Sequence, residues 1–143
     1  MTVASILKEK PDRLISVQES STLSDVAEIL TRENIGAVPV LDAKGDMTGI
    51  ISERDIVRQI AREGAGVLAR TVSSIMTKNV LCCAPEDTVS STMALMTQRR
   101  FRHLPVRSNG RIIGMISIGD VVKRRVEDAE REAASLRDYI VRG

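Results

Sequence analysis

The sequence contains almost no aromatic residues: its 143 residues include one Phe (Phe101), one Tyr (Tyr139) and no Trp. A hydrophobic core must therefore be built from aliphatic side chains. Apolar residues make up 43% of the chain, which is enough for one compact domain or for two half-domains that share an interface. Since few rings are present to stack on a nucleobase, we expect modest affinity for any base-containing ligand.

Cysteine and histidine are also scarce. Cys82 and Cys83 are adjacent and His103 is the single His, which excludes a Cys–His zinc site and a disulfide framework. We interpret the two cysteines as strand residues, one facing in and one facing out. The sequence has no phosphate-binding loop, dinucleotide fingerprint, metalloprotease motif or nucleophile elbow, and no nucleophile set surrounds His103. We therefore expect no enzyme activity and no metal site.

Long hydrophobic runs and a strong net charge are missing as well. The chain has 21 Lys and Arg against 19 Asp and Glu, a formal net charge of +2, so no overall field would attract nucleic acid or an anionic membrane. No apolar stretch approaches the roughly 20 residues needed to cross a bilayer, and residues 1–10 lack the apolar region of a signal peptide. The sequence predicts a soluble, cytoplasmic protein that binds neither nucleic acid nor membrane.

What the sequence does contain is an internal repeat. Residues 38–57 resemble residues 104–122: Pro39 corresponds to Pro105, and the pattern Gly-x-x-Ser-x-x-Asp occurs at 49–55 and again at 114–120. Each copy then runs into a helical pattern. The similarity covers most of the chain and predicts two equivalent structural units.

Each copy is typical of a β-α-β-β-α unit. In the first copy we expect an extended segment at 14–17, a helix capped by Ser21 or Thr22, a hairpin of strands 37–41 and 48–51, and a helix to about Arg62. In the second copy the equivalents are 80–83, a cap at Asp87 or Thr88, and strands 103–106 and 112–117. We predict an α/β (α+β) fold: repeat 1 at 8–66, a linker at 67–75, repeat 2 at 76–130 and a C-terminal helical extension at 131–143. One copy is too small to bury its sheet alone, so we expect the two to pack face to face about a pseudo-twofold axis.

The last helix carries a heptad pattern beyond the repeat. Its apolar residues are spaced four and three apart in alternation: Val122, Val126, Ala129, Ala133, Leu136 and Ile140. Such a seam is expected to lie on another apolar surface. The repeats of its own chain and a second copy of the protein are both suitable partners.

These motifs resemble those of the CBS (cystathionine beta-synthase) domain family. The marks are the closing Gly-x-x-Ser-x-x-Asp, the Val-x-x-Ile-Met-Thr at 72–77, the Gly-Ala-Val-Pro-Val at 36–40 and the Arg-His-Leu-Pro-Val at 102–106. The resemblance implies a stand-alone, bacterial-type pair of CBS repeats, or Bateman module, shaped as a disc with clefts between the repeats. It also implies adenosine-containing ligands (AMP, ADP, ATP, NAD or S-adenosylmethionine) and a homodimer.

The paired serine and aspartate of each repeat have chemistry that suits a nucleotide. A carboxylate in the first turn of a helix, as at Asp55 and Asp120, can accept bonds from both ribose hydroxyls. The hydroxyls of Ser52 and Ser117 and the free N–H groups of the same turn suit a phosphate, which Arg54 could also bind. The same pattern is close to a capping box, which needs no ligand. The Gly three residues before each Ser favours the ligand, because it permits close approach to the backbone.

The resemblance also assigns residues to two clefts. Arg102 and His103, before the Leu-Pro, would work with Ser52, Arg54 and Asp55, while Gly36, Ala37 and Val38 would work with Ser117 and Asp120. The complete predicted nucleotide-binding set is Ile15, Val17, Gly36, Ala37, Val38, Pro39, Ser52, Arg54, Asp55, Leu81, Arg102, His103, Leu104, Pro105, Ile116, Ser117, Gly119 and Asp120. Because the Asp55 cleft carries more cationic groups, we expect it to prefer more phosphates.

The sequence therefore predicts a regulatory module that binds an adenine nucleotide and signals to a partner by a shift in conformation. An effector protein acted on in trans is a candidate partner. The alternative is a ligand-free dimerisation or docking module with the same fold.

Overall fold

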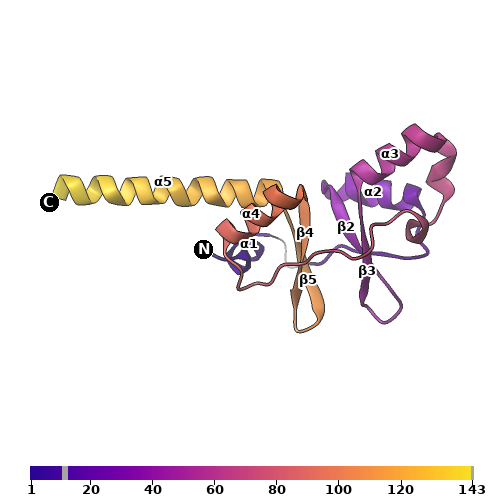
Figure 1. Ribbon diagram of the computed structural model, residues 1–143, viewed down its shortest axis with the longest axis horizontal. Helices are drawn as coiled ribbons and strands as arrows, with labels where there is room; N and C mark the ends of the chain where they lie inside the picture. Colours follow the sequence, from indigo (N-terminus) through magenta and orange to yellow (C-terminus); the bar gives the residue numbers. More distant parts are fainter. Residues whose placement is uncertain (11–12, 143) are drawn as a thin grey trace.

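The computed structural model describes residues 1–10 and 13–142 and consists of two halves and a long helix (Figure 1). The first half contains β1 (Val17–Gln18), α2 (Leu23–Glu33), β2 (Ala37–Leu41), β3 (Met47–Ser52) and α3 (Glu53–Glu63), followed by two short 3₁₀ helices, η1 (Ala65–Ala69) and η2 (Val72–Ser74). The second half contains α4 (Val89–Arg99), β4 (His103–Ser108), β5 (Arg111–Ser117) and α5 (Ile118–Arg142), together with α1 (Val3–Lys8) from the start of the chain. This arrangement confirms the predicted α/β fold of two repeats with a C-terminal helix.

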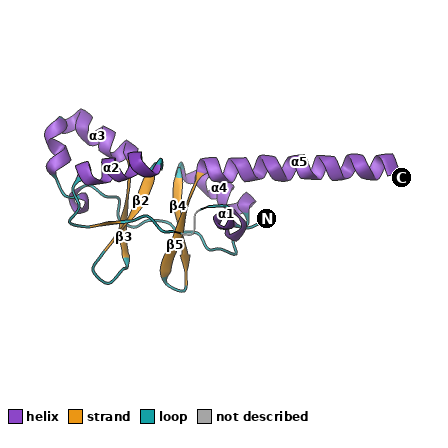
Figure 2. Ribbon diagram, turned by 180° about the vertical axis from the view of Figure 1, so that it is seen from behind, coloured by secondary structure: helices purple, strands orange, loops and turns teal. Residues whose placement is uncertain are grey.

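The two halves carry separate sheets that lie side by side (Figures 1 and 2). In the first, β2 pairs parallel with β1 and antiparallel with β3; in the second, β4 pairs antiparallel with β5. The predicted extended segment at 80–83 is not a strand, because only Cys83 forms a bridge, to Val106. Toward residue 80, the next bond of that parallel ladder would need the N–H of residue 105, and Pro105 has none.

Threonine caps the first helix of each half. Thr22 and Asp25 exchange hydrogen bonds of 3.1 Å at the start of α2, a complete capping box. At the start of α4 the Thr88 hydroxyl accepts a hydrogen bond of 3.0 Å from the N–H of Ser91. The sequence left two candidate caps in each repeat, and the threonine is the cap in both. Gly64, at φ 84°, follows the end of α3, one residue beyond the predicted Arg62.

Each half has its own aliphatic core. In the first half, Leu23, Val26 and Leu30 of α2 pack with strand residues that include Val38 and Ile51. In the second half the equivalent side chains are Val89, Met96, Leu104, Val106, Ile116 and Val121. Phe101 and Tyr139 are both exposed. The cores are thus built without aromatic rings, as the composition predicted.

Short segments exchanged between the halves complete both cores. Val3 of α1 donates a hydrogen bond to the carbonyl of Asp87 at 2.9 Å and is fully buried in the second core. Val72, in the equivalent place, donates to the carbonyl of Ser21 at 2.8 Å and is fully buried in the first core. Residues 2–6 (Thr-Val-Ala-Ser-Ile) resemble residues 71–75 (Thr-Val-Ser-Ser-Ile), a part of the repeat that our sequence comparison missed. Since each half is closed by a segment preceding the other, the halves interlock.

Helix α5 leaves the body of the molecule and projects from it (Figure 1). Val121 and Arg124 are its buried residues, and every described residue from Ala129 to Arg142 is exposed. The apolar seam therefore does not lie on the repeats of its own chain, which removes one of the two partners considered. Over residues 1–10 and 13–142, none of the helices is long and apolar enough to cross a membrane.

Candidate functional site

A continuous cleft of about 1340 Å³ runs along the junction between the two halves. It is bordered by the starts of α3 and α5, the end of α4, and chain segments near Lys10 and Leu81. Twelve of the predicted residues line it: Ile15, Gly36, Ala37, Ser52, Arg54, Asp55, Leu81, Arg102, His103, Leu104, Ser117 and Asp120. The two clefts expected from the sequence are therefore parts of one space.

The other six predicted residues lie outside the lining. Val17, Val38 and Ile116 are core residues, because their strands turn these side chains toward the helices that cover each sheet. Pro39 and Pro105 are buried within β2 and β4, and Gly119 is exposed on the first turn of α5. Their positions next to lining residues in the sequence explain why the motif alone could not separate the two groups.

Both Ser-x-x-Asp pairs form capping boxes. In the first half, Asp55 Oδ2 accepts from the Ser52 N–H at 2.9 Å, and the Asp55 N–H donates to Ser52 Oγ at 3.2 Å. In the second half the equivalent Ser117–Asp120 bonds are 2.9 and 3.1 Å. Both carboxylates thus bind their own backbone, as the ligand-free interpretation requires, yet both also line the cleft. Capping uses Oδ2 of each aspartate, and no described residue donates a hydrogen bond to either Oδ1.

The glycines before each serine have a different role from the one predicted. A Cβ atom at Gly49 would lie 2.7 Å from Met76 Sδ and 2.8 Å from the Thr77 carbonyl oxygen. At Gly114 it would lie 2.8 Å from a Cδ of Leu7. The close approach is made by the exchanged segments of the chain, so these glycines no longer favour a ligand over a simple cap. The two glycines do permit a close approach to the backbone, as predicted, but it is an exchanged segment of the chain that makes this approach.

Asp120 and Asp55 differ in their surroundings, because Lys10 forms an ion pair with Asp120. Its Nζ lies 2.8 Å from Asp120 Oδ2 and donates a second hydrogen bond, of 2.9 Å, to the Met115 carbonyl. Burial by itself raises the pKa of Asp120, but hydrogen bonds from Lys10 and Ser117 and the Lys10 charge hold that pKa below its ordinary value. For Asp55 the described residues provide no ion pair. Nothing in the sequence marked Lys10, because it follows α1 and meets Asp120 only through the interlock.

His103 lies between the two predicted clefts. Its Nε2 lies 2.9 Å from the position that a Cβ of Gly36 would occupy, and Glu53 Oε1 lies 3.6 Å from the same point. Burial lowers the pKa of His103 below its ordinary value, which outweighs the opposing charges of Glu53 and Asp120. The imidazole is therefore neutral near pH 7 and can both donate and accept a hydrogen bond. His103 lies against Gly36, which the sequence had assigned to the other cleft.

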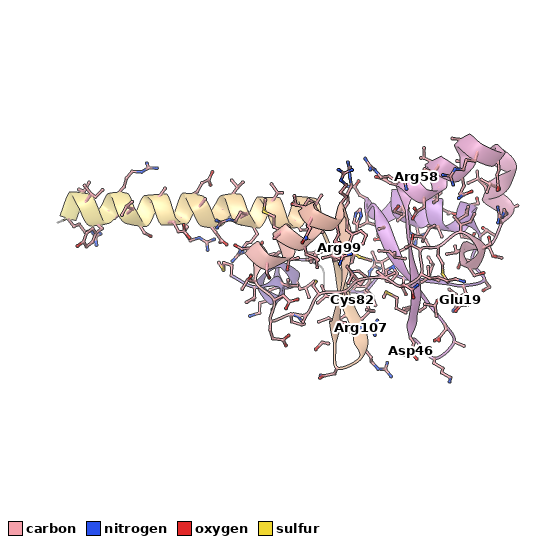
Figure 3. All side chains as sticks on the ribbon, in the orientation of Figure 1. Glu19, Asp46, Arg58, Cys82, Arg99 and Arg107 are labelled. Atoms are coloured by element: carbon pink, nitrogen blue, oxygen red, sulfur yellow. The ribbon has the colours of Figure 1, made fainter. Side chains whose placement is uncertain are left out.

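Basic side chains outnumber acidic ones in the cleft, and several of them were not in the predicted set. Arg54 and Arg102 were predicted; the others are Lys8, Lys10, Arg13, Arg58, Arg99 and Arg100, against the acids Glu33, Glu53, Asp55 and Asp120. Figure 3 shows Arg58 on α3 and Arg99 at the end of α4, on the two sides of the junction. A lining with this excess of cations can bind phosphates, and its apolar part, with Ile15 and Leu81, can contact an adenine ring.

Comparison with known proteins gives one consistent result. A family model described as CBS domain matches residues 3–62 and 72–127. A mitochondrial CBS domain-containing protein of Arabidopsis thaliana is 37% identical over 126 residues, which are 85% of this chain and 61% of that protein. This chain therefore spans less than two thirds of that relative.

Two solved structures have the same fold. A CBS-domain containing protein from Agrobacterium tumefaciens is 44% identical, with a TM-score of 0.84 over 87% of this chain and 99% of that one. The CBS domain pair of protein MJ0100, solved in complex with 5′-methylthioadenosine and S-adenosyl-L-methionine, is 26% identical, with a TM-score of 0.79 over 90% of this chain and 98% of that one.

Proposed function

Because this chain belongs to the CBS domain family, we propose that it is a regulatory module, not an enzyme, that binds an adenine nucleotide in the cleft between its two halves. The observation that carries the proposal is the content of that cleft. It combines helix-start carboxylates, an excess of basic side chains and an apolar wall within one space. These are the groups that a ribose, a phosphate chain and an adenine ring require.

Within the cleft, Asp55 is the proposed ribose ligand. Its capping bonds fix the carboxylate through Oδ2, which leaves Oδ1 to accept from the sugar hydroxyls. Arg54, Arg58 and Arg102 are the proposed phosphate ligands, since all three line the cleft. Asp120 is the weaker candidate because Lys10 already binds its carboxylate.

The ligand class is AMP, ADP, ATP or NAD. Both ligands in the solved CBS domain pair of MJ0100 contain adenosine, which supports the nucleoside part of the proposal. The basic lining supports a ligand that also carries phosphates. We expect the Asp55 end of the cleft to prefer the longer phosphate chain, as predicted from the sequence.

A nucleotide in this position would act by linking the halves. Helix α3 starts from the first half and α5 from the second, and the residues at both starts line the cleft. A ligand that contacts both would favour one relative orientation, which a homodimer or a separate effector protein could recognise. The cytoplasmic location expected from the sequence stays a prediction.

The test is calorimetric titration of the whole chain with AMP, ADP, ATP and NAD, together with the variant Asp55→Asn. Asp25→Asn is the matched control, because Asp25 makes the same capping box on α2 but does not line the cleft. We expect Asp55→Asn to weaken nucleotide binding by roughly tenfold or more, the loss of one charge-assisted contact, and Asp25→Asn to leave it unchanged.

Two results would count against the proposal. If none of the four nucleotides binds or raises the unfolding temperature, the ligand-free docking module becomes the better description. If Asp25→Asn weakens binding as much as Asp55→Asn, the effect of Asp55 comes from helix capping and not from ligand contact.

A further inference from the structure

The exposed seam of α5 has no partner within the described chain. Its larger members have high exposed fractions: Val122 41%, Val126 51%, Leu136 61% and Ile140 68%. Figures 1 and 2 show the helix projecting away from the two halves in both views. Apolar residues repeated at positions a and d of a heptad leave a continuous stripe in water unless another helix covers them.

Position a of the seam faces away from the body of the molecule. The side of α5 that packs on its own second half carries Val121, Arg124 and Asp128. Arg124 is buried there, where it donates a 2.7 Å hydrogen bond to Glu9 and lies 3.5 Å from Asp128. These three residues occupy positions c and f, nearly opposite Val126 and Ala133 at position a. Leu136, at position d, borders an open hollow that Met1 and Thr88 also line. The body therefore leaves room for a second helix along the seam.

We infer that α5 is the dimerisation element of this protein: the seams of two copies pack together as a parallel two-stranded coiled coil. The seam contains β-branched Val126 and Ile140 at position a and Leu136 at position d, the combination that favours two strands. Ala129 and Ala133 lie between them and allow the helices to approach closely. From 122 to 140 the seam is about 28 Å long at 1.5 Å per residue.

The charged residues at positions e and g favour a second copy of this chain as the partner, and they favour a parallel orientation. In a parallel pair, position g of one helix lies beside position e of the next heptad on the other. Arg125 (g) would then face Glu130 (e) of the second copy, and Glu132 (g) would face Arg137 (e). All four side chains are exposed, and none of them forms an ion pair within the described residues. Symmetry doubles the contacts, so four opposite-charge pairs would flank the seam.

The antiparallel arrangement brings like charges together. Matching the same apolar layers in that orientation places Glu130 beside Glu130 of the second copy, Glu132 beside Glu132, and Lys123 beside Arg137. These repulsions oppose that pairing. A parallel pair also leaves both sets of repeats at the same end, each on the outer side of its helix.

The inference deepens the homodimer of the proposed function and does not depend on nucleotide binding. Sedimentation velocity of the whole chain between about 1 and 100 μM should show a dimer. Leu136→Glu places a carboxylate in the seam of each helix, so we expect the dimer dissociation constant to rise by roughly 100-fold, one factor of ten for each buried charge. Val141→Glu is the control: Val141 is 85% exposed and lies off the seam at position b.

A charge swap tests the orientation. Arg125→Glu should weaken the dimer, and Arg125→Glu combined with Glu130→Arg should restore it, because only the parallel pair places these residues together. Nucleotide titration and circular dichroism of each variant separate this result from the proposed function, since residues 125–141 lie outside the cleft. A chain that is monomeric throughout, a dimer that Leu136→Glu does not weaken, or a charge swap that fails to restore it would overturn the inference.

Discussion

The close contact between Gly49 and the 72–77 segment can be tested by the effect of glycine substitutions on stability. At Gly49, a Cβ would meet Met76 Sδ at 2.7 Å and the Thr77 carbonyl oxygen at 2.8 Å, a fixed backbone atom. That same carbonyl accepts a 3.0 Å hydrogen bond from the N–H of Ile50, and the Thr77 N–H donates to the Ile50 carbonyl at 2.9 Å. Gly49→Ala must therefore push the 72–77 segment away or strain both bonds.

The expected cost of Gly49→Ala is about 2 kcal/mol, within the usual range for overpacking a tight site. Gly114→Ala meets only the tip of Leu7, a flexible side chain, and should cost about 1 kcal/mol or less. Gly66→Ala is the control, because nothing lies within 4 Å of its Cβ position; there we expect no loss, or a small gain from reduced freedom of the unfolded chain.

Urea and thermal unfolding followed by circular dichroism measure all three variants. For a chain of this size, 2 kcal/mol corresponds to a fall in unfolding temperature of about 6–8 °C. We expect the order of stability to be Gly66→Ala, then Gly114→Ala, then Gly49→Ala. If Gly49→Ala is as stable as Gly66→Ala, the close approach of the 72–77 segment is refuted, and with it the structural role of the repeated glycine.

Three further predictions concern single groups. Hydrogen bonds from Lys10 and Ser117 lower the pKa of folded Asp120, so the stability that they add is present above the unfolded pKa of about 3.9 and lost as pH falls through the folded pKa. Lys10→Met should reduce that pH dependence, at a cost of about 1 kcal/mol or less because the pair is partly exposed. An unchanged profile of urea stability from pH 2 to 5 would contradict this. In calorimetry, Asp55→Ala should weaken ATP more than AMP binding relative to Asp120→Ala; equal losses for both nucleotides in both variants would refute the preference of the Asp55 end. Burial, with charge from Asp87 and Cys82, raises the pKa of the Cys83 thiol to about 12. Iodoacetamide at pH 8 should therefore modify Cys82 first and Cys83 only on unfolding. Equal modification rates of the two cysteines, followed by mass spectrometry, would contradict the burial of Cys83.

The candidate site was partly readable from the sequence. The Ser-x-x-Asp pattern located the starts of α3 and α5, and both aspartates do line the cleft. Lys10 could not be found in this way, because its contact with Asp120 spans 110 residues and depends on where the end of α1 packs. Arg58 was equally hidden, since a single charge on a helix carries no sign of the surface that it will face.

Local pattern alone determined most elements of this protein: a helix, a hairpin and a second helix in each copy, the last of them with a heptad seam. Capping, turn and periodicity preferences act over a few residues and are therefore visible in the sequence. The tertiary structure alone decided that α1 closes the second core, that the two clefts join into one, and that the α5 seam faces solvent. These features depend on contacts between distant segments, and such contacts are selected by the burial of the whole chain and not by any local preference.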